Sequence, residues 1–213
     1  MSREPVWWVA VRVLDLVVRA VVDLRIVGLD RIPPTGAALL AANHVSFLDP
    51  VVVLVTGHRA GRKVRFLAVQ EAFERPVTGW FLRAGRHIPV AEGAGQLRAL
   101  RAVHAMLADG ELVLVYPEGT IAAAPGAAAR PGAGWLAVTS GAPVVPIGTA
   151  GLERRERAPR LRRRRARVFI GAPVALDDLA DGHGRTRDLA VSDRILAAVR
   201  DLEAAAASDL HPV

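Results

Sequence analysis

The segment AALLAANHVSFLDP, residues 37–50, contains an uninterrupted apolar run that ends abruptly in polar residues. Residues 37–42 are all alanine or leucine, and such a short apolar run bounded by polar residues is typical of a strand. A helical pattern follows over residues 47–55, with Asp49 and Pro50 near its start. We therefore predict a strand that leads into a helix, with His44 at the junction.

The same alternation continues outward through most of the 213 residues. Further strands are predicted over residues 24–29, 64–68, 111–116, 144–148 and 166–171. Further helices are predicted over residues 76–83, 96–108, 132–140 and 187–206. This order predicts a single α/β domain over residues 24–213, with a largely parallel central sheet flanked by helices. A hydrophobic content of 52% is enough for a chain of this length to bury a sizeable core.

The first 23 residues form an apolar stretch that charges interrupt at spacings of three, four and four. These charges are Arg12, Asp15, Arg19 and Asp23. On a helix they share one stripe, and they are too dense for a membrane span. With two tryptophans near one end, residues 1–23 are predicted to form an amphipathic helix at a membrane interface. The alternative is a helix that packs into the core of the domain.

The positive charge of the chain is concentrated in one segment. Residues 153–167 contain nine arginines and two glutamates, a surplus that equals the net charge of +7 of the whole chain. Such a patch is either a solvated face or a contact for an anionic membrane surface. No aromatic side chains interleave it and the chain has one tyrosine, so we expect no nucleic-acid partner.

His44 and Asp49 are the first candidates for chemistry, because a histidine at a strand end and an aspartate five residues later can hydrogen-bond. The carboxylate would fix the imidazole tautomer, and the imidazole could then accept a proton from a hydroxyl. Pro117, Glu118, Gly119 and Thr120 follow another predicted strand. Ligand sites of α/β sheets gather at the carboxyl ends of strands, so the two segments should converge. A structural hydrogen bond is the alternative role of the pair.

Several other chemistries find no motif in the sequence. The chain has no cysteine, no Gly-x-Ser-x-Gly elbow and no phosphate-binding Gly-x4-Gly-Lys loop. It also lacks a His-Glu-x-x-His pair, and we predict no metal site. A thiol nucleophile is excluded.

Three blocks together resemble the glycerolipid acyltransferase family, whose best-known member is 1-acylglycerol-3-phosphate acyltransferase. They are Asn-His-x-Ser-x-x-Asp-Pro at residues 43–50, Pro-Glu-Gly-Thr at residues 117–120, and the apolar segment at residues 142–147. His44 and Glu118 are 74 residues apart, as in that family, and the resemblance covers about residues 24–175.

The resemblance implies transfer of a fatty-acyl group from acyl-CoA or acyl-carrier protein to the free hydroxyl of a lysophospholipid. The default acceptor is 1-acylglycerol-3-phosphate, which gives phosphatidate. His44 would be the general base, Asp49 would orient it, and Glu118, Gly119 and Thr120 would bind the acceptor. No cofactor beyond the acyl-carrying co-substrate is implied. The enzyme would sit peripherally or monotopically at the cytoplasmic face of the cell membrane.

Two departures from the family bear on the acceptor. The family's second block usually reads Ile-Pro-Val-Asp-Arg, whereas this chain has Ala91 and Glu92 after residues 88–90, and Ile121 follows Thr120 where the family often has arginine. A phosphate favours bidentate arginine and is repelled by glutamate. Either a neighbouring arginine compensates, with Arg86 the first candidate and Arg98 and Arg130 as others, or the acceptor has no free phosphate.

Two alternatives for function therefore remain. The first is the same chemistry on a non-phosphate acceptor, such as a lyso-ornithine lipid or a glycolipid. The second is a non-catalytic module that binds anionic lipid or nucleic acid through the arginine segment.

Overall fold

The structure is a computed structural model that describes residues 4–91, 94–119, 127–153, 163–179 and 182–210. Its helices are α1 (Glu4–Val21), α2 (Asp49–Arg59), α3 (Gln70–Glu74), α4 (Pro76–Ala84), α5 (Ala94–Ala108), α6 (Pro131–Ser140) and α7 (Gly184–Leu210). Its strands are β1 (Val22–Val27), β2 (Ala38–Ala42), β3 (Val64–Val69), β4 (Ile88–Val90), β5 (Leu112–Val115), β6 (Val144–Ala150) and β7 (Arg164–Ile170).

The seven strands form one sheet in the order β1-β7-β6-β2-β5-β3-β4. All neighbouring strands are parallel except β6 and β7, which are antiparallel. This arrangement confirms the predicted α/β domain with a largely parallel sheet.

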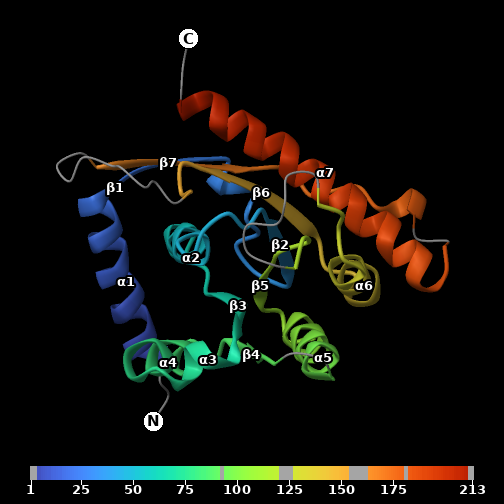
Figure 1. Ribbon diagram of the computed structural model, residues 1–213, viewed down its shortest axis with the longest axis horizontal. Coiled ribbons are helices and arrows are strands. Elements are labelled where there is room, and N and C mark those ends of the chain that lie inside the picture. Colours follow the sequence, from blue (N-terminus) through green and yellow to red (C-terminus); the bar gives the residue numbers. More distant parts are fainter. Residues whose placement is uncertain (1–3, 92–93, 120–126, 154–162, 180–181, 211–213) are drawn as a thin grey trace.

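Helices cover both faces of the sheet (Figure 1). Because successive strand residues point to opposite faces, β2 contributes Leu40 to one core and Leu39 to the other. The first core is closed by α1, α2 and α4, and the second by α5, α6 and α7. All five residues of β2 are fully buried, so the loop after β2 leaves the centre of the sheet.

Two short elements were not predicted. α3 has five residues and β4 has three, which is too short for a clear hydrophobic period. β4 contains Pro89, which an edge strand tolerates because one of its sides needs no hydrogen-bond donor.

Helix α1 has two apolar sides. Trp7, Val11 and Val18 are buried in the core, with Trp7 only 1% exposed. On the other side, the valines and the leucine at positions 6, 9, 13, 16 and 17 are about half exposed or more. The alternative prediction, a core-packing helix, therefore describes one side of α1, and the membrane prediction can apply only to the other. In the described part of the chain, no helix is both long and apolar enough to cross a membrane.

One detail of the predicted charge stripe is wrong. Asp23 does not continue the helical stripe of Arg12, Asp15 and Arg19, because α1 ends at Val21 and Asp23 lies in β1. The residue pairs in register with Arg165 of β7. Helix and sheet follow one another without a linker, and a membrane-interfacial role for residues 1–23 remains a prediction.

Candidate active site

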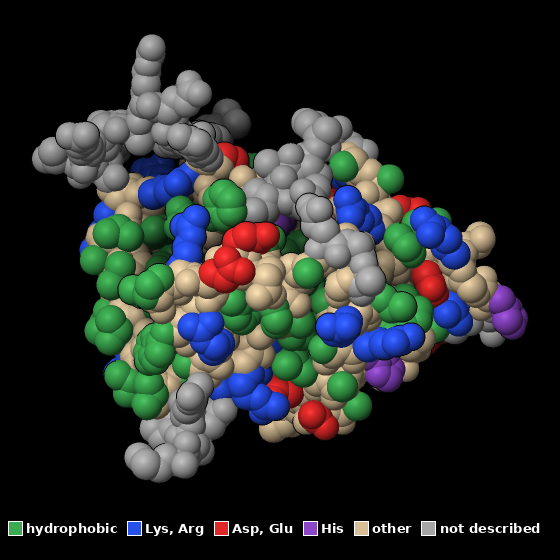
Figure 2. Space-filling view, turned by 60° about the horizontal axis from the view of Figure 1, so that its bottom comes forward, with side chains coloured by type: hydrophobic (Ala, Val, Ile, Leu, Met, Phe, Trp, Pro, Cys, Tyr) green, Lys and Arg blue, Asp and Glu red, His purple; other side chains and the backbone are tan. Residues whose placement is uncertain are grey.

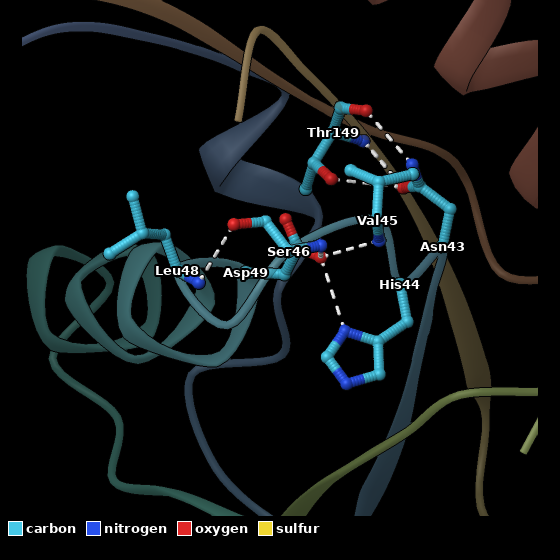
Figure 3. Close-up of polar contacts among 7 residues, drawn as sticks. All are labelled: Asn43, His44, Val45, Ser46, Leu48, Asp49 and Thr149. Atoms are coloured by element: carbon cyan, nitrogen blue, oxygen red, sulfur yellow. Dashed lines mark hydrogen bonds and ion pairs between the residues drawn. The ribbon is translucent and has the colours of Figure 1, made fainter. Parts of the chain in front are cut away.

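His44 and Asp49 meet at the carboxyl end of β2 (Figure 3). The Nδ1 atom of His44 lies 3.1 Å from Oδ2 of Asp49. The same carboxylate oxygen accepts hydrogen bonds from the backbone N–H groups of Val45 and Ser46, each at 2.7 Å. Three donors on one oxygen leave the carboxylate little freedom to rotate. Asp49 itself is fully buried in the first turn of α2.

This arrangement determines which nitrogen of His44 can do chemistry. When Nδ1 carries the proton that Asp49 accepts, Nε2 keeps a free lone pair on the side of the ring away from the carboxylate (Figure 3). The His44 side chain is 10% exposed. The imidazole is therefore largely shielded but not closed off, as a proton acceptor for a bound hydroxyl should be.

The ring of Tyr116 stacks on one face of the His44 imidazole. Its ring centroid lies 3.9 Å from that of His44 with an angle of 11° between the ring planes. The phenol oxygen is buried and has no hydrogen-bond partner among the described residues. Burial, with a smaller contribution from the nearby charge of Asp49, raises the pKa of Tyr116 well above its ordinary value. The uncharged ring of Tyr116 thus packs on the imidazole and restricts its rotation.

Asn43 anchors the loop that carries the pair. Its side-chain amide donates to the carbonyl of Thr149 at 2.9 Å and accepts from the Thr149 backbone N–H at 2.8 Å (Figure 3). These two side-chain bonds tie the residue that follows β2 to β6, beyond the last register pair of Ala42 and Ile147. Sequence reasoning gave Asn43 and Tyr116 no role, although both directly follow a predicted strand or end one.

Glu118 converges with the pair, as predicted. Ala41 and Val115 are register partners in β2 and β5, and His44 and Glu118 each lie three residues further on. Burial raises the pKa of Glu118, an effect that Arg200 and a hydrogen bond from the His44 backbone partly offset. Glu118 therefore lies against the loop that carries His44.

Helix α7 brings two charged residues that the sequence did not single out. Burial raises the pKa of Glu203, a hydrogen bond from Asn43 lowers it, and the charge of Glu118 raises it again. The positive charge of Arg200 lowers the pKa of both Glu118 and Glu203. The helix comes this close because Gly148 has no side chain: a Cβ there would be 2.2 Å from the backbone nitrogen of Glu203.

Gly119 has a similar need for space. Its φ is 71°, and a Cβ would lie 2.5 Å from Cδ of Arg130, whose side chain crosses the glycine. The backbone N–H of Arg130 donates to the carbonyl of Pro117 at 2.8 Å. Among the described residues, Arg200 is therefore the cation whose charge acts on Glu118, and the side chain of Arg130 lies against the neighbouring Gly119. Thr120, Glu92 and Ile121 lie outside the described residues.

Arg86, our first candidate for a phosphate ligand, lies elsewhere. Its guanidinium is 3.6 Å from the carboxylate of Glu111, which directly precedes β5, whereas Glu118 follows that strand. The two glutamates are thus at opposite ends of β5. The structure brings His44, Asp49, Glu118 and Gly119 together, and it does not bring Arg86 to them.

A fold of this kind with a buried histidine–aspartate pair at the end of a central strand matches an acyltransferase. The model of the family described as Acyltransferase matches residues 23–150, more than half of the chain, and the chain belongs to this family. The matched residues include His44, Asp49 and Glu118.

Individual relatives refine this placement. The chain is 31% identical over 130 residues to a 1-acyl-sn-glycerol-3-phosphate acyltransferase of Chlamydomonas reinhardtii, a match that covers 59% of the chain and 38% of that protein. It is 36% identical over 97 residues to an uncharacterised protein of Mycobacterium tuberculosis, covering 43% of the chain and 25% of the relative. The chain thus spans well under half the length of these relatives.

A solved structure shows the same fold over almost the whole chain. The 1-acyl-sn-glycerophosphate (LPA) acyltransferase PlsC from Thermotoga maritima superposes with a TM-score of 0.69 at 21% sequence identity. The superposition covers 95% of this chain and 82% of that one. At this identity the likeness establishes the architecture, including the part of the chain beyond residue 150.

Proposed function

We propose that this protein is an O-acyltransferase that moves a fatty-acyl group from acyl-CoA or acyl-carrier protein to the free hydroxyl of a lysophospholipid, with 1-acylglycerol-3-phosphate as the default acceptor. The observation that carries the proposal is the His44–Asp49 pair, buried and oriented, with no hydrogen bond from the described residues to Nε2 of His44. The family membership supports the same reaction.

In this reaction Nε2 of His44 accepts the proton of the acceptor hydroxyl while the oxygen attacks the thioester carbonyl. The resulting tetrahedral oxyanion collapses, the C–S bond breaks, and the departing thiolate takes the proton from the imidazolium. Asp49 stabilises the imidazolium between the two proton transfers, and its carboxylate does not itself become protonated. General-base assistance of this kind contributes roughly 10²–10⁴ in rate. No acyl-enzyme forms.

The charges beside His44 favour a second candidate acceptor. Glu118 and Glu203 are half-buried carboxylates close to the catalytic loop, and a phosphate monoester with close to two negative charges would meet both. Arg200 offsets these charges only in part. A lyso-ornithine lipid or a glycolipid, whose amine or hydroxyl groups can donate to carboxylates, fits this balance of charge.

We further propose that α1 attaches the protein to the cytoplasmic face of an anionic membrane. Hydrophobic side chains gather along the margin that α1 forms (Figure 2). Val6 of α1 and the half-exposed Trp80 of α4 line one cavity of about 330 Å³, so the exposed apolar surfaces of the two helices meet. Arg163, one of the arginines of the basic segment, donates to the carbonyl of Ala20 at the end of α1.

The decisive experiment incubates purified protein with acyl-CoA or acyl-carrier protein and a panel of lyso-lipids, and identifies the products by mass. We expect an acylated product with at least one acceptor and its loss in His44→Ala. A folded His44→Ala variant with normal turnover would refute the base assignment. Absence of product with every acceptor, together with salt-sensitive lipid or nucleic-acid binding, would favour the non-catalytic module.

A further inference from the structure

A basic cleft lies between α1 and α2, away from the candidate active site. Its volume is about 440 Å³, and it is lined by Arg12, Asp15, Leu16, Arg19, His58 and Arg59. His58 and Arg59 are in the last turn of α2, whereas Asp49 is in the first. Ten residues of helix separate the two ends by about 15 Å. The cleft is therefore distinct from the site at His44.

Asp15 organises the cleft. It is 6% exposed, and its carboxylate accepts hydrogen bonds from Arg59, at 2.7 and 3.0 Å, and from Arg19, at 3.0 Å. Burial alone would raise the pKa of Asp15, but the bonds from Arg59 and Arg19 hold it below its ordinary value. The carboxylate is thus ionised and holds two guanidinium groups side by side.

The cations of the cleft exceed what Asp15 can neutralise. Arg12 has no ion-pair partner among the residues that the structure describes, so three guanidinium groups face one carboxylate. Nδ1 of His58 is buried and also lacks a partner within the described part of the chain. A tie between α1 and α2 needs only Asp15 and Arg59. Arg12 takes no part in that ion pair, whereas the ring of His58 also contacts Trp8 of α1.

The cleft opens beside the exposed apolar side of α1. Leu16 belongs to both, because it lines the cleft and is 61% exposed. Arg12 and Arg19 are seven residues apart, which places them on one side of the helix, two turns from each other. If the apolar side of α1 enters a bilayer, the two arginines lie at the level of the lipid phosphates.

We infer that the cleft between α1 and α2 binds the phosphate of an anionic glycerophospholipid of the membrane, with Arg12 and Arg19 as its principal ligands. Guanidinium groups suit phosphate because they donate two parallel hydrogen bonds to it. This lipid would be bound for attachment and orientation, not acylated. The inference rests on the proposed membrane position of α1 and is independent of the acyl-transfer reaction.

The test measures binding of the full chain to two kinds of vesicle, phosphatidylcholine alone and phosphatidylcholine mixed with phosphatidylglycerol. Arg12→Gln should weaken binding to the mixed vesicles about fivefold, and Arg12→Gln with Arg19→Gln about 25-fold, since each basic residue near such a surface contributes about 1 kcal/mol. Binding to phosphatidylcholine alone should not change. Thermal unfolding of each variant checks that α1 remains packed.

Matched controls separate a site from diffuse charge. Arg101 and Arg185 are exposed arginines of α5 and α7, and changing both to Gln alters the net charge equally. If this pair weakens binding as much as the α1 pair, or if Arg12→Gln has no effect, the inference is wrong. It is also wrong if inorganic phosphate displaces the protein as well as a soluble glycerophosphoglycerol headgroup does. Failure of both vesicle types to bind wild type would instead refute the membrane position of α1.

Discussion

Asp49→Asn is the sharpest test of the catalytic pair, because the structure lets the charge be removed with little change of shape. If the amide oxygen of Asn takes the position of Oδ2, it can still accept from His44 and from the N–H groups of Val45 and Ser46. The NH2 group then occupies the position of Oδ1, which is buried without a partner in the described part of the chain. The opposite orientation would point NH2 at two N–H donors.

The expected loss of activity follows from the missing charge. An imidazolium and a carboxylate about 4 Å apart interact by about 4 kcal/mol at an effective dielectric constant of 20. That is an upper value for the loss, and about 2.7 kcal/mol already gives a hundredfold. We therefore expect acyl transfer to fall by about a hundred- to a thousandfold in kcat. His44→Ala should fall by at least about a hundredfold.

The assay is steady-state thiol release from acyl-CoA with the acceptor that the product screen identifies. Burying the new NH2 group costs about 1–3 kcal/mol of stability, so unfolding must be measured alongside. Asp188→Asn is the matched control: it places an amide at another buried aspartate, paired with Arg187 in α7. The control should keep its activity. A folded Asp49→Asn enzyme with turnover close to wild type would refute the proposed role of the carboxylate.

Three further predictions concern Tyr116 at the candidate site, the buried His87 away from it, and the two sides of α1. Tyr116→Phe keeps the ring on His44 and removes a buried hydroxyl that has no partner among the described residues. Turnover should therefore stay within a few-fold of wild type, and thermal stability should hold or rise. A large drop in either quantity would mean that the hydroxyl has a partner. Burial lowers the pKa of His87 from 6.5 to about 3, so folding should lose stability as pH falls below 6.5, by about 2 kcal/mol at pH 5. His87→Phe should flatten this slope in denaturant titrations, and an unchanged slope would point to another group. Leu16→Ser should weaken binding to neutral vesicles without lowering the unfolding temperature. Trp7→Ala should instead cost about 3–5 kcal/mol of stability. If Leu16→Ser destabilises the fold and Trp7→Ala weakens only vesicle binding, the assignment of the core side and the membrane side of α1 is wrong.

The central part of the fold could be predicted because its signals are local. The apolar runs at residues 37–42 and 144–148 are bounded by turn-forming or polar residues, and the structure places β2 and β6 at nearly the same bounds. β4 could not be predicted, because three residues at a sheet edge carry no period. The two sides of α1 also escaped prediction. One apolar pattern serves both a core side and an exposed side, and only packing decides which residues are buried.

The residues of the candidate site also fall into those that the sequence could predict and those that it could not. His44, Asp49 and Glu118 could be predicted because each lies in a short block at the end of a strand. Arg200 and Glu203 could not, because they reach the site only through the packing of α7 on Gly148. Arg86 was chosen by proximity in sequence, and the structure places it beside Glu111, at the other end of β5 from Glu118.

This division has a consequence for the acceptor. The family match ends at residue 150, and the residues of the catalytic pair lie within it, whereas α7 begins at Gly184. The His44–Asp49 pair and the charges of Glu203 and Arg200 are therefore supplied by different parts of the chain. A change in α7 can alter the charge that a head group meets without moving His44 or Asp49. Under the proposed function, the choice of head group therefore depends on α7 as well as on the matched blocks.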